Sequence, residues 1–486
     1  MMMRSDSQTI PPQTVRAKVQ DRPTALRLCG RIMAPGACTA RIGPTAIRAA
    51  MMTAIMAAIM ALAFAVPGLA QTAAPQPVAG PAELMAALRG ARGGDILLLA
   101  PGDYGVLALT GGKDMPAAAG SGDVTAPPVI LRAADPARPA RFSGMRLRDA
   151  AGLAFQGVTF AYSFAPGDVP HRHRPFRVLQ SRDITFSGVL FAGDLARGGA
   201  AHDNGYGAGH GLFVSGSRGI VLENSEFRDW HKAAIFTGSS QITVRGNDIH
   251  AIRSDGLNFS AVQSVLIEGN RIHDFNRSLA SPDHADMIQI FTARTTTPTR
   301  DLVIRGNLLN AGGGKFTQSI FMRNEAVDTG FAGPEMAYRN ITIENNVIIN
   351  AHLHGITVGP ADGLSITRNT LIRNFRARGE GRGEKLWIPQ IRIAPTARNV
   401  VIRGNAAAAI SGHSDQPDWT VADNVLLQTE HPGQPGYYGD IFADALAGDP
   451  RDPASFAYLP GGLLDGLRRG ADLLRLPMTG AAAQGG

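Results

Sequence analysis

A six-residue pattern that recurs ten times constrains this chain more than any other feature of its sequence. Each copy has apolar residues at its first and third positions and usually Gly, Asn or Asp at its fifth. Alternating apolar and polar residues predict a short strand with one buried face. The fifth position suits a left-handed turn, which Gly, Asn and Asp adopt most readily. The copies begin at Leu153, Ile184, Ile220, Ile242, Val265, Leu302, Ile341, Leu364, Val400 and Trp419.

The spacing of the copies indicates how these strands are arranged. Ser225, Asn247 and Asn270 end successive copies that lie 22 or 23 residues apart, and several other neighbours lie 36 to 39 residues apart. The longer intervals indicate the same unit carrying a long loop. A strand and a turn of this length can bury their apolar side only by stacking on the next copy. The sequence therefore predicts one long solenoid rather than several domains.

This pattern resembles the right-handed parallel β-helix of the pectin-lyase-like superfamily. The segments Gly94–Gly105 and Pro127–Ala134 are similar to the opening coils of poly-mannuronate and chondroitin lyases with this fold. Residues 81–91 read as an amphipathic helix that would cover the open end of the core. The resemblance implies an all-β fold, a single-stranded right-handed parallel β-helix (solenoid) with an N-terminal capping helix. We expect this solenoid over residues 71–430, and an irregular coil and cap over residues 431–486.

The first 70 residues have the composition of a segment that is removed during export. They hold eight of the 47 Lys and Arg residues but only two of the 40 Asp and Glu residues, and an apolar run spans Met51–Val66. Basic residues, a short apolar run and small residues at a cut site are typical of a secretory signal peptide. We expect residues 1–70 to be a leader with a signal peptide cleaved after Ala70, and a secreted or periplasmic mature protein. An uncleaved anchor is the alternative.

Removal of this leader changes the charge and the cysteine content. Lys and Arg fall from 47 to 39, and Asp and Glu from 40 to 38, so the positive excess that would suggest a nucleic-acid partner nearly disappears. Both cysteines, Cys29 and Cys38, lie in the leader, so we expect no disulfide in the mature chain. We also expect no nucleic-acid partner, no membrane span after cleavage, and a monomer.

A second short strand follows in each predicted coil, and the long loops precede it. Loops over residues 192–209, 276–285, 311–317 and 376–388 would emerge along one edge of the stack. Loops gathered on a rigid scaffold commonly wall a binding site, so we expect a groove that holds an extracellular polysaccharide. The third residues of the second strands should face inward: Leu212, Ile235, Leu257, Ile288, Ile320, Ile356 and Ile391. The next residues should face outward: Phe213, Phe236, Asn258, Gln289, Phe321, Thr357 and Arg392.

Two acidic residues, Asp255 and Asp286, begin equivalent second strands in consecutive coils. Stacked strands lie about 4.8 Å apart, so these carboxylates should be near neighbours. Two acids this close either separate their pKa values for acid–base work or share a cation such as Ca²⁺. Asp283 and His284 add to the cluster, and Asp255, Asp283 and Asp286 are our candidate Ca²⁺ ligands. The alternative is a structural column of aspartates that caps turn amides.

Several polar and aromatic residues near this pair are candidates for substrate binding. They stand at the start of the second strands, on the outward face of those strands, or beside the predicted groove. The tryptophan among them would either stack on a sugar ring or fill the core of a loop. The candidates are His210, Trp230, His231, Asn258, Gln289, His354 and Arg392.

The resemblance also implies a reaction. Lyases of this fold cleave uronate polymers by β-elimination, with Ca²⁺ or Arg neutralising the uronate carboxylate and Lys or Arg taking the C5 proton. On this sequence, Lys232 or Lys315 is the candidate base and Arg323 the candidate neutralising group. Asp255 and Asp286 would bind Ca²⁺, and His284 is a further catalytic candidate. We therefore predict a polysaccharide lyase.

Two other functions stay open. A glycoside hydrolase or a uronan epimerase would use the same fold, and polygalacturonases have clustered aspartates with a Gly-His-Gly tripeptide such as Gly209-His210-Gly211. A non-catalytic carbohydrate-binding or surface solenoid would need only the groove.

Overall fold

A computed structural model describes residues 74–114, 127–379, 383–466 and 468–475. These residues belong to one compact unit, Thr72–Gly486. The predicted leader and signal peptide over residues 1–70 lie outside the described residues. In the ranges that are described, no helix has the length and the apolar character that crossing a bilayer requires.

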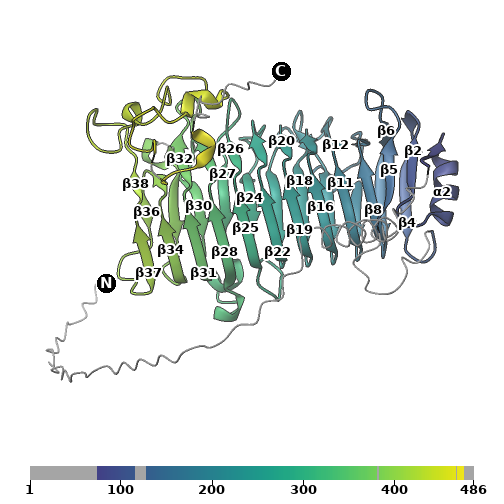
Figure 1. The fold of residues 1–486 in the computed structure, drawn as a ribbon, viewed down its shortest axis with the longest axis horizontal. Coiled ribbons are helices and arrows are strands. Elements are labelled where there is room, and N and C mark those ends of the chain that lie inside the picture. Colours follow the sequence, from purple (N-terminus) through teal and green to yellow (C-terminus); the bar gives the residue numbers. More distant parts are fainter. Residues whose placement is uncertain (1–73, 115–126, 380–382, 467, 476–486) are drawn as a thin grey trace, which may run out of the picture. The chain divides into compact units, whose positions relative to one another are not determined.

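The alternating pattern forms three long parallel sheets, and each coil of the chain contributes one strand to sheet A, then sheet B, then sheet C (Figure 1). Sheet A contains β1 (Gln76–Val78), β2 (Ile96–Leu99), β5 (Val129–Ala133), β8 (Ala151–Gln156), β11 (Arg182–Ser187), β16 (Arg218–Glu223), β19 (Ser240–Arg245), β22 (Gln263–Glu268), β25 (Arg300–Arg305), β28 (Tyr338–Glu344), β31 (Ala361–Thr367), β34 (Arg398–Arg403) and β37 (Trp419–Ala422). Sheet B contains β3 (Gly102–Asp103), β6 (Ala140–Phe142), β9 (Thr159–Ala161), β12 (Leu190–Ala192), β17 (Glu226–Arg228), β20 (Asp248–His250), β23 (Arg271–His273), β26 (Leu308–Asn310), β29 (Val347–Asn350), β32 (Thr370–Arg373), β35 (Ala406–Ala407) and β38 (Val425–Leu426). Sheet C contains β4 (Val106–Thr110), β7 (Gly144–Arg148), β10 (Phe176–Leu179), β15 (His210–Ser215), β18 (Lys232–Thr237), β21 (Asp255–Ser260), β24 (Asp286–Ile290), β27 (Gln318–Met322), β30 (His354–Val358), β33 (Gln390–Ile393) and β36 (Ile410–Ser411).

A few short elements cover the ends and loops of the solenoid. Helix α2 (Pro81–Gly90) buries Leu84 and Leu88 against the first coils, as predicted for the capping helix. The other elements are an antiparallel pair, a short helix and five 3-10 turns. They are β13 (Asp194–Leu195) with β14 (Gly207–Ala208), α3 (Glu325–Asp328), η1 (Pro334–Met336), η2 (Glu384–Trp387), η3 (Tyr438–Asp440), η4 (Pro453–Phe456) and η5 (Asp472–Leu474).

The asparagine that ends most copies of the repeat forms a buried ladder between coils. Asn307 is fully buried, and its side-chain amide donates to Asn346 Oδ1 at 2.9 Å and to the Ile267 carbonyl at 3.0 Å. Its Oδ1 accepts the backbone N–H and the side-chain amide of Asn270, both at 2.9 Å. The same contacts recur from Asn247 to Asn424, so this column ties each coil to the next.

Replacement of Asn307 by alanine should destabilise the fold by about 3 kcal/mol, because it leaves buried donors of Asn270 without their acceptor. Chemical unfolding in urea measures this change. Val303→Ala, on the outward face of the same strand β25, is the matched control and should shift the midpoint far less. Equal shifts for the two variants would contradict a special role for the ladder.

Strand β18 begins one residue earlier than the sequence pattern suggested. His210 pairs with Lys232 and Lys232 with Asp255, so Ala234, and not Ile235, stacks in the inward column with Leu212 and Leu257. The prediction that Phe236 faces outward is wrong. Phe236 is buried and stacks on Phe259 at a ring distance of 5.0 Å. The small Ala233-Ala234 pair hid the register, because neither residue signals which face it occupies.

The C-terminal segment folds back over the outer face of sheet B. Tyr438, Phe442 and Tyr458 pack with Val347 and Ile372, which are the outward apolar residues of β29 and β32. The carbonyl of Pro450 accepts the Asn310 side-chain amide at 2.7 Å, and that of Ala447 accepts Arg376 Nη2 at 2.6 Å. Where described, the predicted cap therefore consists of coil and 3-10 turns that cover an apolar face.

Candidate functional site

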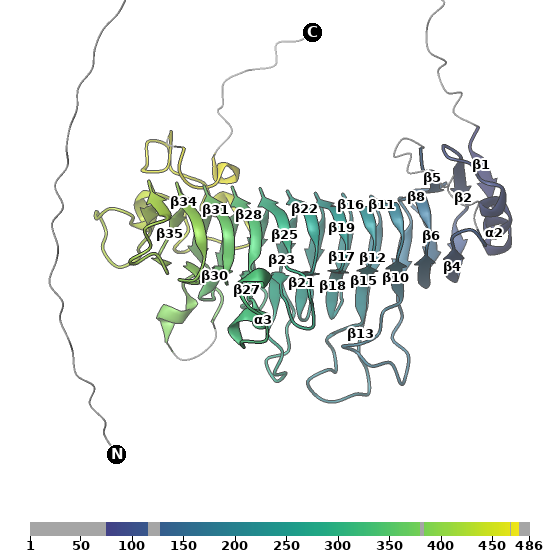
Figure 2. The ribbon, with the colours of Figure 1, turned by 90° about the horizontal axis from the view of Figure 1, so that it is seen from below.

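The start of the sheet C strands brings a column of polar residues together. Register places Lys232 beside Asp255, and Asp286 beside Gln318, on consecutive coils. Two of the strand-start residues contact the residue three positions further on, since Asn258 donates to Asp255 Oδ2 at 3.0 Å and His354 Nδ1 lies 2.8 Å from Thr357 Oγ1. The long loops precede these strands, and Figure 2 shows the loop that carries β13 projecting beside them.

Asp255 is a buried carboxylate whose oxygens are already engaged. Oδ2 contacts the Lys232 ammonium and the Asn258 amide, and Oδ1 accepts the Asp286 backbone N–H at 3.1 Å and the Ser254 hydroxyl at 3.2 Å. Burial alone would raise the pKa of Asp255, but Lys232 and Asn258 hold it below its ordinary value. Asp255 is therefore the ionised member of the acid pair, paired internally with Lys232.

Asp286 is the protonatable member, and it is joined to an exposed histidine. Asp286 is completely buried, and its Oδ2 lies 2.9 Å from Nδ1 of His284, whose side chain is 56% exposed. Burial, with the nearby Asp255 carboxylate, raises the pKa of Asp286 to about 7. The contact with Asp286 raises the pKa of His284. The pair therefore binds or releases a proton near neutral pH.

One ligand atom each of Asp255, His284 and Asp286 lies within 4.8 Å of the others, a grouping that can hold a metal ion. Ca²⁺ takes roughly six to eight oxygen ligands. Here one donor is an imidazole nitrogen, and the Lys232 ammonium already contacts Asp255. Asp283, the third candidate ligand, pairs instead with Arg253 at 3.2 Å and lies 3.7 Å from His231. This donor set fits Ca²⁺ poorly.

Arg253, which no pattern in the sequence singles out, joins two of the loops beside the site. It is 3% exposed, and its guanidinium contacts Asp203 from the loop before β15 and Asp283 from the loop before β24. Ser281 Oγ accepts a third, longer hydrogen bond at 3.4 Å. Because Asp283 precedes His284, this ion pair fixes the segment that carries the exposed imidazole. Arg253 is thus a positioning residue for this loop.

Three of the long loops line a cleft of about 770 Å³ that includes His284. Its walls carry four basic side chains, Arg277, Lys315, Arg376 and Arg378, against one carboxylate, Asp283. Lys315, Arg376 and Arg378 are exposed. A cleft with this charge suits an acidic ligand. Lys315 was predicted at this groove from the sequence, but the three arginines were not, because loop residues carry no periodic signal.

The other candidate residues fall into two groups. Gln289, His354 and Arg392 are partly exposed on the sheet C face, and Asn258 is buried where it bonds Gln289 at 2.5 Å. The remaining candidates, Arg323, Trp230, His210 and His231, do not form part of this face. Arg323 follows the far end of β27 and pairs with Asp328, so it does not line the cleft with Lys315.

Trp230, His210 and His231 are buried, so the prediction that they bind substrate at the surface is wrong. Trp230 is 0% exposed and donates its indole N–H to the Phe191 carbonyl at 2.9 Å, which makes it the core of the loop. His210 and His231 are each 3% exposed, and burial lowers the pKa of both. The backbone N–H of His210 donates to the His173 carbonyl at 2.9 Å, so the segment around His173 lies beside the start of β15.

Comparison with known proteins finds solved structures that are similar to this chain at low sequence identity. The Dettilon tailspike protein is 13% identical over 74% of this chain and 63% of its own, with a TM-score of 0.44, so the chain spans less than two thirds of that protein. An alginate lyase from Paenibacillus sp. is 14% identical over 65% of this chain and 98% of its own, with a TM-score of 0.33. An exopolygalacturonase from Thermotoga maritima is 13% identical over 63% and 80%, with a TM-score of 0.38. No curated protein matches the sequence.

A family model described as a right handed beta helix region matches residues 200–377. This range holds the strands from β15 to β32, the acid pair and two of the three cleft loops, and it ends at the start of the third. The predicted parallel β-helix is confirmed by the three parallel sheets, and its central coils match the model of a right handed beta helix region.

Proposed function

We propose that the mature protein acts outside the cytoplasm on an acidic, uronate-bearing polysaccharide and cleaves it by β-elimination. One observation supports this above the others. An exposed imidazole, His284, is held by the buried carboxylate of Asp286 on the wall of a cleft with four basic side chains. Removal of a proton next to a carboxylate requires a general base and nearby positive charges that stabilise the developing negative charge, and this site offers both.

The reaction assigns a task to each of these groups. The base removes the C5 proton of a uronate, the electron pair forms the C4–C5 double bond, and the C4–O glycosidic bond breaks. The leaving oxygen takes a proton from water. His284 Nε2 is the atom that accepts the C5 proton, because Nδ1 is occupied by Asp286. Lys315, exposed on the same cleft, neutralises the uronate carboxylate.

Burial of the two aspartates favours elimination over hydrolysis. A glycoside hydrolase needs carboxyl groups that reach the glycosidic oxygen and the attacking water or sugar carbon. Asp286 is 0% exposed and Asp255 is 1% exposed, and four donors occupy the oxygens of Asp255. We therefore give the aspartates supporting roles and His284 the direct one.

Purified full-length protein incubated with polygalacturonate, alginate or hyaluronan tests this proposal. We expect one polymer to yield shorter chains with the ultraviolet absorbance of an unsaturated uronide. Products one water heavier and without that absorbance would indicate a hydrolase. Unchanged chain length with altered sugar configuration would indicate an epimerase, and polymer that is retained but unchanged would indicate a binding solenoid. Each of these three outcomes would overturn the lyase proposal.

A further inference from the structure

A second cationic pocket lies at a different edge of the solenoid, where strands of sheet A end. Its floor is formed by the turns after β31, β34 and β37, with Arg368, Gly404 and Asp423 at equivalent left-handed positions. Arg468 and Arg469 of the C-terminal segment cover it, and Arg403 and Thr367 complete a volume of about 470 Å³. The cleft beside His284 lies before the sheet C strands and shares no residue with this pocket.

The charges in this pocket do not balance. Asp423 is shared by two arginines, at 2.8 Å from Arg403 and 3.7 Å from Arg469. Asp472, which pairs with the lining residue Arg368 at 2.9 Å, is likewise shared with a second arginine, Arg475, at 3.1 Å. Arg468 has no ion-pair partner in the described part of the chain. These two carboxylates therefore face five guanidinium groups.

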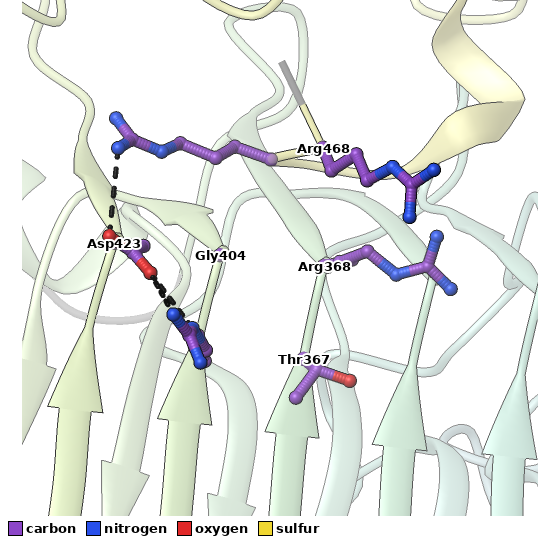
Figure 3. Close-up of a pocket in the computed structure, with 7 residues that line it drawn as sticks. Thr367, Arg368, Gly404, Asp423 and Arg468 are labelled. Atoms are coloured by element: carbon purple, nitrogen blue, oxygen red, sulfur yellow. Dashed lines mark hydrogen bonds and ion pairs between the residues drawn. The ribbon is translucent and has the colours of Figure 1, made fainter.

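The position of Arg468 relative to Arg368, which is paired with Asp472, is also distinctive. Figure 3 shows the guanidinium groups of Arg368 and Arg468 extending to the same side of the pocket, one above the other. Like charges held side by side repel each other unless an anion lies between them. A guanidinium presents its donors as a planar fork that matches the two oxygens of a carboxylate or sulfate. The pocket volume is large enough for a sugar unit that carries such a group.

We propose that this pocket, lined by Arg368, Arg403, Arg468 and Arg469, is a second binding site that takes an oxyanion, namely the carboxylate or sulfate group of an acidic polysaccharide. The oxyanion site stands on its own geometry, and its assignment to a polysaccharide rests on the proposed function. A polymer bound both here and in the cleft would be retained more strongly than by either site alone, since the second contact becomes intramolecular.

Isothermal titration calorimetry on the full-length His284→Ala variant tests the site without turnover. With a short oligogalacturonate we expect two binding events per chain, and Arg468→Glu should reduce them to one. Arg468→Gln should weaken the same event about tenfold. Arg398→Gln, an exposed arginine on β34 that does not line the pocket, should leave both events unchanged. Two unaltered events in Arg468→Glu would overturn the proposal.

Sodium sulfate titrated in place of the oligosaccharide separates the possible sources of the oxyanion. Sulfate binding that Arg468→Glu removes, together with displacement by oligogalacturonate, supports a polysaccharide group as the ligand. Sulfate binding without displacement overturns the assignment to a polysaccharide, and no binding of either probe overturns the site itself. Thermal unfolding of each variant checks the fold, and Arg468 makes no ion pair whose loss would destabilise it. If the lyase assay fails while two binding events persist, the result contradicts the proposed function but not this second site.

Discussion

Replacement of His284 by alanine should lower kcat at least 100-fold and leave the fold intact. Removal of a general base costs about 100- to 10,000-fold in rate. The imidazole is exposed and contributes little to the core, so thermal unfolding should change little. The measurement is the initial rate of unsaturated-product formation on the polymer identified as substrate. His413→Ala, which removes another exposed histidine outside the cleft, is the control and should keep full activity.

The pH profile distinguishes a catalytic His284 from a structural one. The base must be neutral, and the contact with Asp286 raises the pKa of His284, so kcat/KM should rise with pH through a value above about 6.5. In Asp286→Asn this rise should move to lower pH, while the plateau falls because the imidazole loses its orienting partner. An unshifted profile in Asp286→Asn would show that the titrating group is not His284.

The Asp286→Asn variant should also differ from the wild type in how its stability depends on pH. The folded pKa of Asp286, about 7, lies above the ordinary carboxyl value of 3.8, so the folded protein binds this proton more tightly than the unfolded chain. The contribution of the Asp286 proton to the free energy of unfolding is fully present below the ordinary carboxyl pKa of 3.8. This contribution is lost as the pH rises towards 7. Asp286→Asn removes this titration. Its stability relative to the wild type should therefore increase between about pH 4 and pH 7.

Replacement of Lys232 by methionine should destabilise the fold by about 4 kcal/mol, a larger effect than the one predicted for Asn307→Ala. Asp255 is buried, and the change leaves its charge without the ammonium that compensates it. Urea unfolding at neutral pH measures the loss. The double variant Lys232→Met/Asp255→Asn should recover most of it, because no uncompensated charge then remains. A single variant as stable as the wild type would contradict this role.

Acid and activity measurements complete the test of Lys232. The folded pKa of Asp255 is depressed, so its contribution to stability is present above the ordinary carboxyl value and lost as pH falls through the folded pKa. The difference in stability between wild type and Lys232→Met should therefore shrink in acid.

If His284 is the base, the double variant Lys232→Met/Asp255→Asn should still release unsaturated product. Complete loss of activity in that folded variant would instead favour Lys232 as the base.

The fold was predictable because its periodic residues report backbone geometry directly. The alternating apolar residues and the terminal asparagines mark sheet A, and the interval between copies marks each long loop. Register failed only at β18, where the Ala233-Ala234 pair does not distinguish inside from outside. Lys232 and Asp255 were separate candidates in the sequence. Their pairing depends on the shifted register of β18, which the sequence did not reveal.

The candidate site was predictable only in part, because its contacts join residues far apart in the sequence. Asp255 and Asp286 occupy repeated positions, so their proximity followed from the repeat. The pairing of Arg253 with Asp203 depends on a loop 50 residues away, and no local pattern encodes it. The burial of Trp230 and His210 likewise depends on loop packing, which a polar or aromatic residue beside a predicted groove does not reveal.

The return of the C-terminal segment across sheet B has a consequence for the order of assembly. A solenoid can stack its coils one after another as the chain emerges, because each coil contacts mainly its neighbours. Arg376 of the cleft, however, donates a hydrogen bond to the Ala447 carbonyl. Asn310, which precedes a cleft loop, donates one to the Pro450 carbonyl. The cleft walls are therefore completed only after residues 447–450 arrive. Stacked coils that lack these residues would hold a cleft without two of its supporting hydrogen bonds.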